Sequence, residues 1–416
     1  MLGKRQTLEK MRHHDIPPGA LRPRAPMRGR YLIRSRKSVI LIATIDLLLR
    51  LLPKAAPEPL TPPYDRILLA NWGHIGDVLL TLFAVADLRR AYPDAKIGML
   101  TGSWGKAAAL GSGLVDTVHV VDHWALNRAR DSKKTKLQRF LSTRSTAMEE
   151  IKSAQYQIGI DFYPFFPPAH PTFWSCGIPI RIGYESGGLG PFLTHPRTWH
   201  DSDRSVTDYC RDILKDLLPS RLAPGRIGWS YPKEPPTGAA SSSLPRNYIV
   251  VHPGAGAPFK DWGPENWQAL VLALHAAGST VVITGSGPQE TKFAHDLASL
   301  AEDVVDLSGK TTWRDFVGVI ADASALICPD SAAAHLAAFF RIPTVAIFTG
   351  TNNPKQWAPR NPRARVLLKA TACAPCYRPG CRAMACIRGI TVAEVLDTLR
   401  TLQERPPADI QTASHP

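Results

Sequence analysis

The stretch CPDSAAAH at residues 328–335 decides the fold. It follows the apolar run ALI at 325–327 and precedes the apolar residues LAAFF at 336–340. A short apolar run of this kind is typical of a strand buried on both faces of a parallel sheet, and the residues after it predict a helix. The stretch therefore predicts a strand-to-helix junction at the carboxyl edge of a parallel sheet, where open α/β sheets bind ligands.

Four residues of this junction are candidates for binding an anion. Asp330 and Ser331 are good N-cap residues, because their side chains accept hydrogen bonds from first-turn N–H groups. The small side chain of Ala332 would let a ligand approach the backbone, and the positive end of the helix favours a phosphate. His335 lies about one turn further on and can donate a hydrogen bond. An ordinary capped helix with a packed histidine is the alternative, and this stretch alone leaves both open.

The same strand–turn–helix pattern occurs in both halves of the chain. In the first half, apolar runs predict a helix at 78–90 and strands at 66–70, 95–100, 118–121 and 158–160. In the second half, they predict strands at 247–251, 280–284, 304–309, 325–328 and 344–348. Strands that alternate with helices predict parallel sheets covered on both faces. The predicted fold class is therefore α/β, with two Rossmann-like domains that face a central cleft.

Composition sets the predicted domain boundaries within the 416 residues. Residues 1–64 are predicted to form a basic tail and an amphipathic helix, and residues 65–225 the first domain. Residues 226–246, rich in proline and serine, form a linker, and residues 247–405 form the second domain.

Glycine-containing turns follow several of the predicted strands. Asp77 ends the turn NWGHIGD after the first strand, and its simplest role would be to cap the following helix. In the second domain, HPGAG at 252–256 leads to Lys260, and GSGP at 285–288 precedes Glu290. The first turn lacks the G-x-G-x-x-G fingerprint, which argues against a nicotinamide cofactor.

Together these motifs resemble those of the ADP-heptose:lipopolysaccharide heptosyltransferases, a family of glycosyltransferases with the GT-B fold. The resemblance covers about residues 65–400, and the motifs that carry it are GDVLLT at 76–81, HPGA at 252–255 with Lys260 and Trp262, and Asp330, Ser331 and His335. The chain departs from the family pattern at Ala332, where the family has glycine, and in the loop GTNNP at 350–354.

The resemblance implies an inverting, metal-independent transfer of a sugar, with ADP-heptose as the expected donor and a lipopolysaccharide-type or other lipid-linked glycan as the acceptor. Asp77 would be the general base that accepts the proton of the acceptor hydroxyl. Lys260, the N–H groups at Ser331 and Ala332, and His335 would stabilise the departing diphosphate, with Asp330 as the cap of that helix. The resemblance implies four more donor-binding residues: Gly254, Ala255, Gly285 and, at the ribose, Glu290. No cofactor is expected.

A basic run lies beyond the third predicted strand. It includes Arg128, Arg130, Lys133 and Lys134, opposed by Asp131. A solvated helix face is the ordinary interpretation. Recognition of a phosphorylated or otherwise anionic acceptor is the functional alternative, because guanidinium and ammonium groups bind phosphate well.

The formal charge of the chain is 50 − 35 = +15, and it is concentrated near the N-terminus. Residues 1–54 contain thirteen Lys/Arg and three Asp/Glu, so 13 − 3 = 10 of the excess charges lie there. This distribution argues against a DNA-binding body, whereas a basic N-terminal arm could bind nucleic acid or anionic lipid head groups. We expect anionic lipid rather than nucleic acid as its partner.

The window SVILIATIDLLLRLLP at residues 38–53 is the most apolar in the chain. It is shorter than the roughly 20 residues needed to cross a bilayer and contains Asp46 and Arg50 on one helix face. It predicts a helix in the membrane interface, with residues 28–54 on an anionic surface. Packing on the protein's own core is the alternative, and a true span is the third option.

Four of the seven cysteines are clustered, at Cys373, Cys376, Cys381 and Cys386. A structural metal site, a disulfide or redox pair, and packed free thiols are all compatible with this spacing. None of these interpretations places the cluster in the reaction.

The leading interpretation is a cytoplasmic glycosyltransferase, peripheral on the inner face of the cytoplasmic membrane. A GT-B nucleotide-sugar epimerase, which would need further carboxylates, is one alternative. A non-catalytic nucleotide-sugar or lipid-binding module is another.

Overall fold

The computed structural model describes residues 30–33, 35–51, 58–200, 202–219, 244–376, 381 and 383–404. The chain divides into two compact units, whose described residues lie within 30–219 and 244–404. The predicted linker at 226–246 lies almost wholly outside the described residues, as do the basic tail up to residue 29 and residues 52–57.

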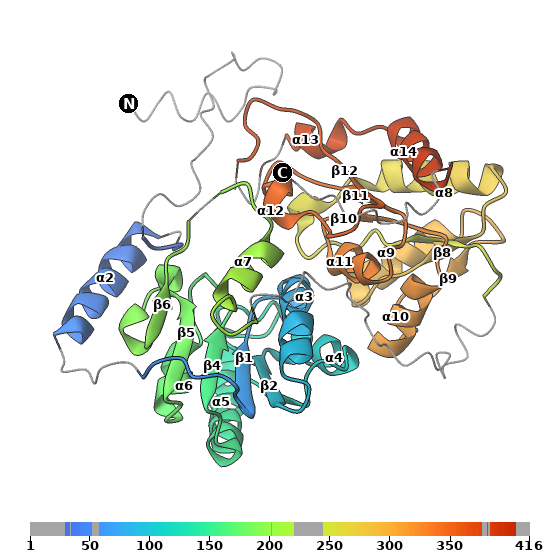
Figure 1. Cartoon of the computed structure of the whole chain (residues 1–416). Coiled ribbons are helices and arrows are strands. Elements are labelled where there is room, and N and C mark those ends of the chain that lie inside the picture. Colours follow the sequence, from blue (N-terminus) through green and yellow to red (C-terminus); the bar gives the residue numbers. More distant parts are fainter. Residues whose placement is uncertain are drawn as a thin grey trace, which may run out of the picture. The chain divides into compact units, whose positions relative to one another are not determined.

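The N-terminal unit is built on a six-stranded sheet in the order β3-β2-β1-β4-β5-β6 (Figure 1). All its strand pairs are parallel. The strands are β1 (Arg66–Ala70), β2 (Lys96–Thr101), β3 (Thr117–Val120), β4 (Ile158–Asp161), β5 (Ile180–Tyr184) and β6 (His195–Arg197). The helices are α2 (Arg36–Arg50), α3 (Ile75–Ala91), α4 (Ser103–Gly111), α5 (Lys133–Ala154), α6 (His170–Ser175) and α7 (Val206–Ile213), with short turns η2 (Glu185–Gly187) and η3 (Gly190–Phe192).

The C-terminal unit repeats this architecture with the sheet order β12-β11-β10-β7-β8-β9, again all parallel. Its strands are β7 (Ile249–Val251), β8 (Val281–Ile283), β9 (Val305–Asp306), β10 (Ala325–Pro329), β11 (Thr344–Ile347) and β12 (Ala364–Leu367). Its helices are α8 (Pro264–Ala276), α9 (Pro288–Ala298), α10 (Trp313–Ala321), α11 (Ala332–Phe339), α12 (Pro354–Trp357), α13 (Ala385–Arg388) and α14 (Val392–Glu404), with the turn η4 (Pro258–Lys260).

Both sheets therefore have the doubly wound order 3-2-1-4-5-6, when strands are counted from the start of each unit. The direction of winding reverses between the first and fourth strands, which are β1 and β4 in one unit and β7 and β10 in the other. Loops at the carboxyl ends of these strands diverge, and such switch points are where doubly wound sheets bind ligands. The predicted α/β class with two Rossmann-like domains is confirmed.

Burial explains why the central strands read as unbroken apolar runs. Every residue of β10 is buried, and four of the five residues of β1 are buried. Helices cover both faces of a parallel sheet, so neither face can be polar. In the C-terminal unit, Trp262 and Trp267 meet edge to face, with ring centroids 5.1 Å apart, inside the core that α8 and α14 complete.

Three strands of the sheets, the internal β5 and the edge strands β6 and β12, were not predicted from the sequence. The strand β6 (His195–Arg197) contains Pro196 and lies at the edge of its sheet, and β12 is only half-buried at another edge. Edge strands lack the continuous apolar run that marks a central strand, and proline is tolerated there because one side of the strand makes no ladder bonds.

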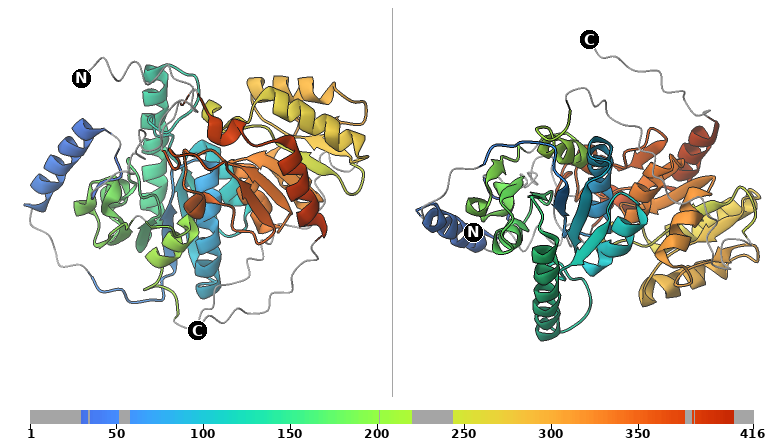
Figure 2. Two further views of the ribbon diagram at one scale, coloured as in Figure 1. Left: turned by 90° about the horizontal axis from the view of Figure 1, so that it is seen from above. Right: turned by 60° about the horizontal axis from the view of Figure 1, so that its bottom comes forward.

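The predicted N-terminal helix exists as α2 and packs at the β6 side of the N-terminal unit (Figures 1 and 2). Its inner face buries Ile42 and Asp46. Ile42 lies against Gly188, where a Cβ atom would come within 2.3 Å of the isoleucine side chain, and Gly188 has a φ of +84°. The alternative of packing on the protein is therefore realised on this face. Among the described residues, no helix is long and apolar enough to cross a bilayer.

Candidate active site

The carboxylate of Asp77 lies in the first turn of α3, just beyond the carboxyl end of β1. Its Oδ2 accepts a hydrogen bond from the His74 backbone N–H at 2.7 Å, so Asp77 occupies the third position of a capping box. The capping role that the sequence allowed is thus present. The capping hydrogen bond does not bury the carboxylate, because the Asp77 side chain remains 22% exposed.

The turn before Asp77 is held by Asn71 and Trp104. The Asn71 side chain accepts from the Gly73 N–H at 2.9 Å and donates to the Asp77 carbonyl at 3.2 Å. The Trp104 indole N–H donates to the Gly73 carbonyl at 2.6 Å, and its ring stacks on His74. Gly73 is required here, because a Cβ atom would lie 2.6 Å from the Asp77 carboxyl. The turn therefore presents Asp77 in one defined position.

Arg128 is the member of the predicted basic run that approaches Asp77. Partial desolvation lowers the pKa of Arg128, and the negative charge of Asp77 opposes that shift. The guanidinium and the carboxylate are therefore within electrostatic range, although the arginine keeps an exposed surface.

Arg130, Lys133 and Lys134 are exposed, from the loop before α5 into its first turn. The sequence predicted all of them, with Arg128, to bind an acceptor. In the described part of the chain, no hydrogen bond or ion pair ties these three residues to Asp77. Their acceptor role stays a prediction.

In the C-terminal unit, a cluster of polar side chains forms at the switch point of the sheet. The Lys260 ammonium donates to Asp330 Oδ2 at 2.6 Å and to the Asp330 backbone carbonyl at 3.3 Å. The Asn352 amide donates to the same Oδ2 at 2.7 Å. The Asp330 side chain is only 7% exposed, so the carboxylate is stabilised by charge-assisted hydrogen bonds rather than by water.

The prediction that Asp330 caps the following helix is wrong. Helix α11 starts at Ala332 with Ser331 as its N-cap, and the carboxylate of Asp330 is turned toward Lys260 instead. A hydrogen bond to an ammonium group is about twice as strong as one to a neutral donor, which explains this choice.

Ser331 also makes no side-chain cap bond, in contrast to the N-caps of α2, α5, α7 and α10. The first turn of α11 thus lacks a side-chain cap that would compete with an anion.

The structure places His335 in the first turn of α11, where it is buried. Two of the small residues beside it, Ala333 and Ala334, are buried as well, whereas Ser331 and Ala332 are half-buried. The roles of Ser331, Ala332 and His335 toward a diphosphate stay predictions.

Glu290, Gly254 and Gly285 come together at the carboxyl ends of β7 and β8. A Cβ atom on Gly254 would lie 2.4 Å from the Glu290 carboxylate, and one on Gly285 would lie 3.3 Å from the Glu290 side chain. Glu290 Oε2 accepts from the Ser286 N–H at 3.0 Å. Burial raises the pKa of Glu290, and the Ser286 hydrogen bond opposes this shift. The half-buried Ala255 follows Gly254 in the same loop.

His252, the first residue of that loop, is a structural histidine. Burial lowers its pKa to about 4, so the imidazole is neutral at neutral pH. Its Nδ1 lies 3.0 Å from the Thr284 hydroxyl, which ties the loop after β7 to the end of β8.

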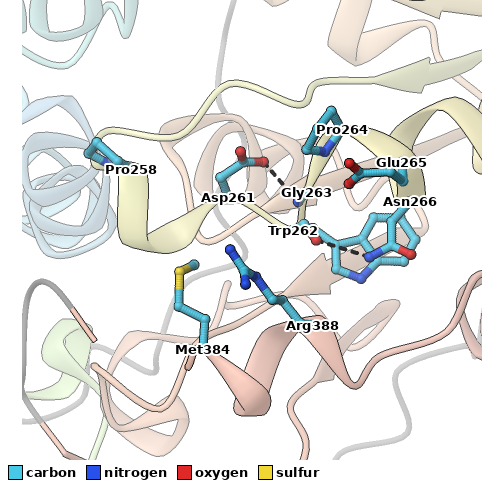
Figure 3. Close-up of a pocket in the computed structure, with 9 residues that line it drawn as sticks. All are labelled: Pro258, Asp261, Trp262, Gly263, Pro264, Glu265, Asn266, Met384 and Arg388. Carbon is cyan, nitrogen blue, oxygen red and sulfur yellow. Dashed lines mark hydrogen bonds between the residues drawn. The ribbon is translucent and has the colours of Figure 1, made fainter. Parts of the chain in front are cut away.

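A cavity of about 410 Å³ lies elsewhere in the C-terminal unit, where the start of α8 faces α13 (Figure 3). Its walls include Asp261, Glu265 and Arg388. The Asp261 carboxylate accepts from the Gly263 N–H at 3.1 Å, a bond drawn in Figure 3. None of the predicted site residues is among the described residues that line it, although Pro258 and Asp261 of its wall lie on either side of Lys260 in the chain.

The four clustered cysteines are free thiols in the structure. The Gly350 N–H points at the sulfur of Cys386 at 3.2 Å, and burial raises the pKa of that thiol. Within the described ranges, no three His, Cys, Asp or Glu side chains form a group that could hold a metal ion. The metal, redox and packed-thiol interpretations of this cluster stay predictions.

Two site residues were not predicted from the sequence. Asn352 belongs to the loop after β11 and reaches Asp330, which is twenty-two positions earlier in the chain. Asn71 shapes the Asp77 turn. An asparagine followed two residues later by glycine is a turn signal, so Asn71 could have been found. The contact of Asn352 depends on β10 and β11 being neighbours, which no local pattern reveals.

Two doubly wound units of the same strand order, each with polar loops at the switch point of its sheet, define the GT-B class of glycosyltransferases. The chain belongs to glycosyltransferase family 9 (heptosyltransferase), whose family model matches residues 150–386, more than half of the chain. It is therefore a glycosyltransferase, and the family that the sequence motifs resemble is confirmed.

Individual relatives agree with this assignment. The chain is 25% identical over 299 residues to lipopolysaccharide heptosyltransferase 3 of Escherichia coli, covering 67% of this chain and 82% of the relative. It is 23% identical over 325 residues to lipopolysaccharide heptosyltransferase 1 of Pseudomonas aeruginosa, covering 76% and 87%. Among solved structures, the ADP-heptose lipopolysaccharide heptosyltransferase II of E. coli superposes with a TM-score of 0.64 at 20% identity, covering 81% of this chain and 98% of that one.

Proposed function

We propose that this glycosyltransferase transfers a heptose from ADP-heptose to a lipopolysaccharide-type, lipid-linked acceptor, with inversion at the anomeric carbon and without a catalytic metal. The donor and acceptor classes are supported by the names of the relatives, which include lipopolysaccharide heptosyltransferases 1, 2 and 3. A solved heptosyltransferase of the same fold is described with ADP-2-deoxy-2-fluoro heptose.

The observation that carries the proposed chemistry is the Asp77 carboxylate, positioned by one backbone N–H and still partly exposed. In the proposed step, the acceptor hydroxyl attacks the anomeric carbon from the face opposite the diphosphate, and Asp77 accepts the hydroxyl proton. The bond from the anomeric carbon to the diphosphate oxygen breaks, and the nucleoside diphosphate leaves with the electron pair. General-base catalysis of this kind contributes about 10²- to 10⁴-fold to a rate.

Lys260 is proposed to stabilise the charge that develops on the leaving diphosphate. An ammonium group has three N–H donors, and two of them are directed at Asp330 in this structure. The third is proposed to bind a phosphate oxygen together with the N–H groups at the start of α11 and the imidazole of His335. Fixed donors aimed at a developing negative charge are the largest electrostatic contribution in many enzymes.

Glu290 is proposed to bind the ribose hydroxyls of the donor. Its carboxylate lies over Gly254 and next to Gly285, where there is no side chain between it and the loop after β7. The Arg128 guanidinium, within electrostatic range of Asp77, is proposed to bind an anionic group of the acceptor. Arg130, Lys133 and Lys134 are proposed to extend this contact.

Transfer is proposed to take place in the cytoplasm, at the inner face of the membrane that holds the acceptor lipid. None of the described cysteines forms a disulfide, which is the usual state in the reducing cytoplasm. Cell fractionation tests this location, together with fusion of the C-terminus to a reporter that is active only in the cytoplasm. Activity of a second fusion, whose reporter works only outside the cytoplasm, would contradict it.

The experiment that tests the function compares ADP-heptose with UDP-glucose, GDP-mannose and ADP alone. We expect ADP-heptose and ADP to raise the melting temperature, because a ligand that binds only the folded state stabilises it. With a heptose-deficient lipopolysaccharide acceptor, only ADP-heptose should give product, and EDTA should not lower the rate. NMR should show that the anomeric configuration of the product is opposite to that of the donor. Stabilisation by UDP-glucose alone, or a product that retains the donor configuration, would reject the proposal.

A further inference from the structure

Helix α2 has an outer face that the N-terminal unit leaves uncovered. The exposed fractions of its large apolar side chains are 68% for Ile40, 61% for Leu41, 61% for Leu47 and 58% for Leu48, and Leu51 at its end is 75% exposed. Scattered exposed leucines are ordinary, but a group of five on one short helix marks an interaction surface.

The exposed apolar residues lie opposite the face that packs on the protein. Successive residues of an α-helix are turned by about 100°, so Leu47, Leu48 and Leu51 lie about 100°, 200° and 140° around the axis from Asp46. Asp46 itself is 1% exposed and accepts a hydrogen bond from the Tyr31 hydroxyl at 2.8 Å. The outer apolar face is therefore distinct from the inner contact, and covering it would not disturb the packing of α2.

The charges around this face are all positive. Arg36 and Lys37 are exposed in the first turn of α2, and Arg50 is exposed in its last turn. The helix has one acidic residue, Asp46, and it faces inward. The sequence adds to this charge, because residues 1–35 contain nine Lys/Arg and two Asp/Glu. An apolar helix face bordered by cations, on a helix whose own single carboxylate is buried, matches the surface of a bilayer that contains anionic lipids.

Helix α2 is joined to the body of the unit by several bonds. Arg30 and Arg50 both form ion pairs with Glu185, the second at 3.5 Å. The Leu32 N–H donates to the Ser186 carbonyl at 2.7 Å. The helix is therefore a fixed part of the N-terminal unit rather than a loose tether.

We infer that the outer face of α2 docks the N-terminal unit on an anionic lipid surface. Ile40, Leu41, Leu47, Leu48 and Leu51 enter the interface between head groups and acyl chains, and Arg36 and Lys37 meet lipid phosphates. This inference does not depend on which sugar the enzyme transfers. Two signals, an apolar face and a basic cluster, are what stable but reversible binding to a membrane surface requires.

Docking through α2 also fixes the orientation of the edge that carries Asp77. Ile42 packs on Gly188, whose carbonyl lies 3.0 Å from His170 Nε2. His170 Nδ1 lies 3.3 Å from the Asp161 carboxylate, and Asp161 pairs in register with Ala70 at the end of β1. A continuous set of buried contacts thus runs from α2 to the strand that leads into the Asp77 turn. The membrane-bound helix would hold the acceptor-binding edge at a constant height above the bilayer.

Flotation of the full chain with vesicles tests the inference. The vesicles contain phosphatidylcholine with or without a quarter of phosphatidylglycerol, at about 0.15 M and 0.5 M salt, where screening lengths differ. We expect wild type to float with the anionic vesicles, and Leu47→Ser/Leu48→Ser to lower its partition coefficient about tenfold or more, since two leucines lose their burial in lipid. Arg36→Glu/Lys37→Glu should remove the preference for phosphatidylglycerol.

The matched control is Leu110→Ser/Leu272→Ser, which alters two leucines that are 43% and 45% exposed on α4 and α8. It should float like wild type. Equal flotation of wild type and Leu47→Ser/Leu48→Ser would overturn the inference, because the basic arm alone would then account for binding. A lipid-free dimer in analytical ultracentrifugation that Leu47→Ser/Leu48→Ser abolishes would also overturn it, by assigning the face to a second copy of the chain.

Discussion

Asp77 and Asp330 both lie at the carboxyl edge of a central parallel strand, beside the start of a helix, yet their carboxylates have different surroundings. Asp77 accepts from the His74 N–H and is 22% exposed. Asp330 accepts from the Lys260 ammonium and the Asn352 amide and is 7% exposed. The same residue type at the switch points of two doubly wound sheets, after the first strand in one unit and after the fourth strand in the other, is thus accessible in one unit and neutralised in the other.

This difference assigns the two carboxylates to different tasks. A general base must reach the proton that it accepts, and an accessible carboxylate beside a helix start can do so. A carboxylate paired with an ammonium group and buried instead keeps that ammonium in place. We therefore propose Asp330 as a positioning residue for Lys260 and Asp77 as the candidate base. Four predictions test this contrast.

The largest effect is expected for Asp77→Asn. The amide oxygen can still accept from the His74 N–H, so the capping box survives, but the proton acceptor is lost. We expect kcat to fall about 10³-fold, within the range for a general base, while ADP binding by calorimetry stays unchanged.

The matched control for this variant is Asp315→Asn, which alters the third position of a second capping box, at Thr312 in α10. It should cost at most about 1 kcal/mol of stability and leave kcat as in wild type. The contrast between the carboxylates would fail if Asp77→Asn kept a tenth of the wild-type activity, or if Asp315→Asn lost as much activity as Asp77→Asn.

A smaller but still large effect is expected for Lys260→Ala. The substitution removes a proposed donor to the diphosphate and leaves the buried Asp330 with Asn352 as its remaining side-chain donor. We expect kcat/KM to fall about 10²-fold, as for the loss of one preorganised donor. Lys310→Ala is the comparison, because Lys310 pairs with Asp306 on the surface and is 61% exposed. Equal losses in the two variants would show that Lys260 has no special role.

An intermediate effect is expected for Gly254→Ala. The new Cβ atom would lie 2.4 Å from Glu290 Oε2, so the carboxyl group has to move away from the loop after β7. We expect donor affinity to fall about tenfold, and the effect to shrink when Glu290 is also Ala, because contacting residues couple in a double-mutant cycle. Additive losses in the double variant would place Glu290 outside the donor site.

The smallest effect concerns the pH dependence of stability in Glu290→Gln. Burial raises the pKa of Glu290 in the folded protein, so its protonated form favours folding. Its stabilising contribution is complete below the ordinary pKa of a glutamate and is lost as pH rises through the raised pKa. The melting temperature of Glu290→Gln relative to wild type should therefore increase from about pH 4 to pH 7. A constant difference between the two proteins would contradict the cause given for the shift.

Much of the fold could be predicted because the signals are local. The strand β1 was predicted with its observed bounds, and β2, β10 and β11 to within a residue or so, since each is an unbroken apolar run that ends at a small-residue turn. The edge strands β6 and β12 were missed, because strands that are not buried on both faces need no such run. The internal strand β5 was missed as well, where Arg181 and Gly183 interrupt the apolar run.

The candidate site was predictable in its members but less so in its contacts. Asp77, Lys260, Glu290 and Asp330 were identified from the motifs, but Asp330 was expected to cap α11 and instead binds Lys260. A side chain at a helix start can accept hydrogen bonds from the first-turn N–H groups, which are close in sequence, or from a donor that is far away in the sequence. Local sequence shows only the first of these.

The sequence by itself determined the order of strands and helices, the repeat of one doubly wound pattern and the family of the enzyme. These follow from hydrophobic runs and short turns, which act over a few residues. Only the tertiary structure decided that Lys260 and Asn352 meet at Asp330, that Arg128 approaches Asp77, and that α2 has one packed and one open face. Such contacts depend on which strands are neighbours in a sheet, because that order brings together residues that are far apart along the chain.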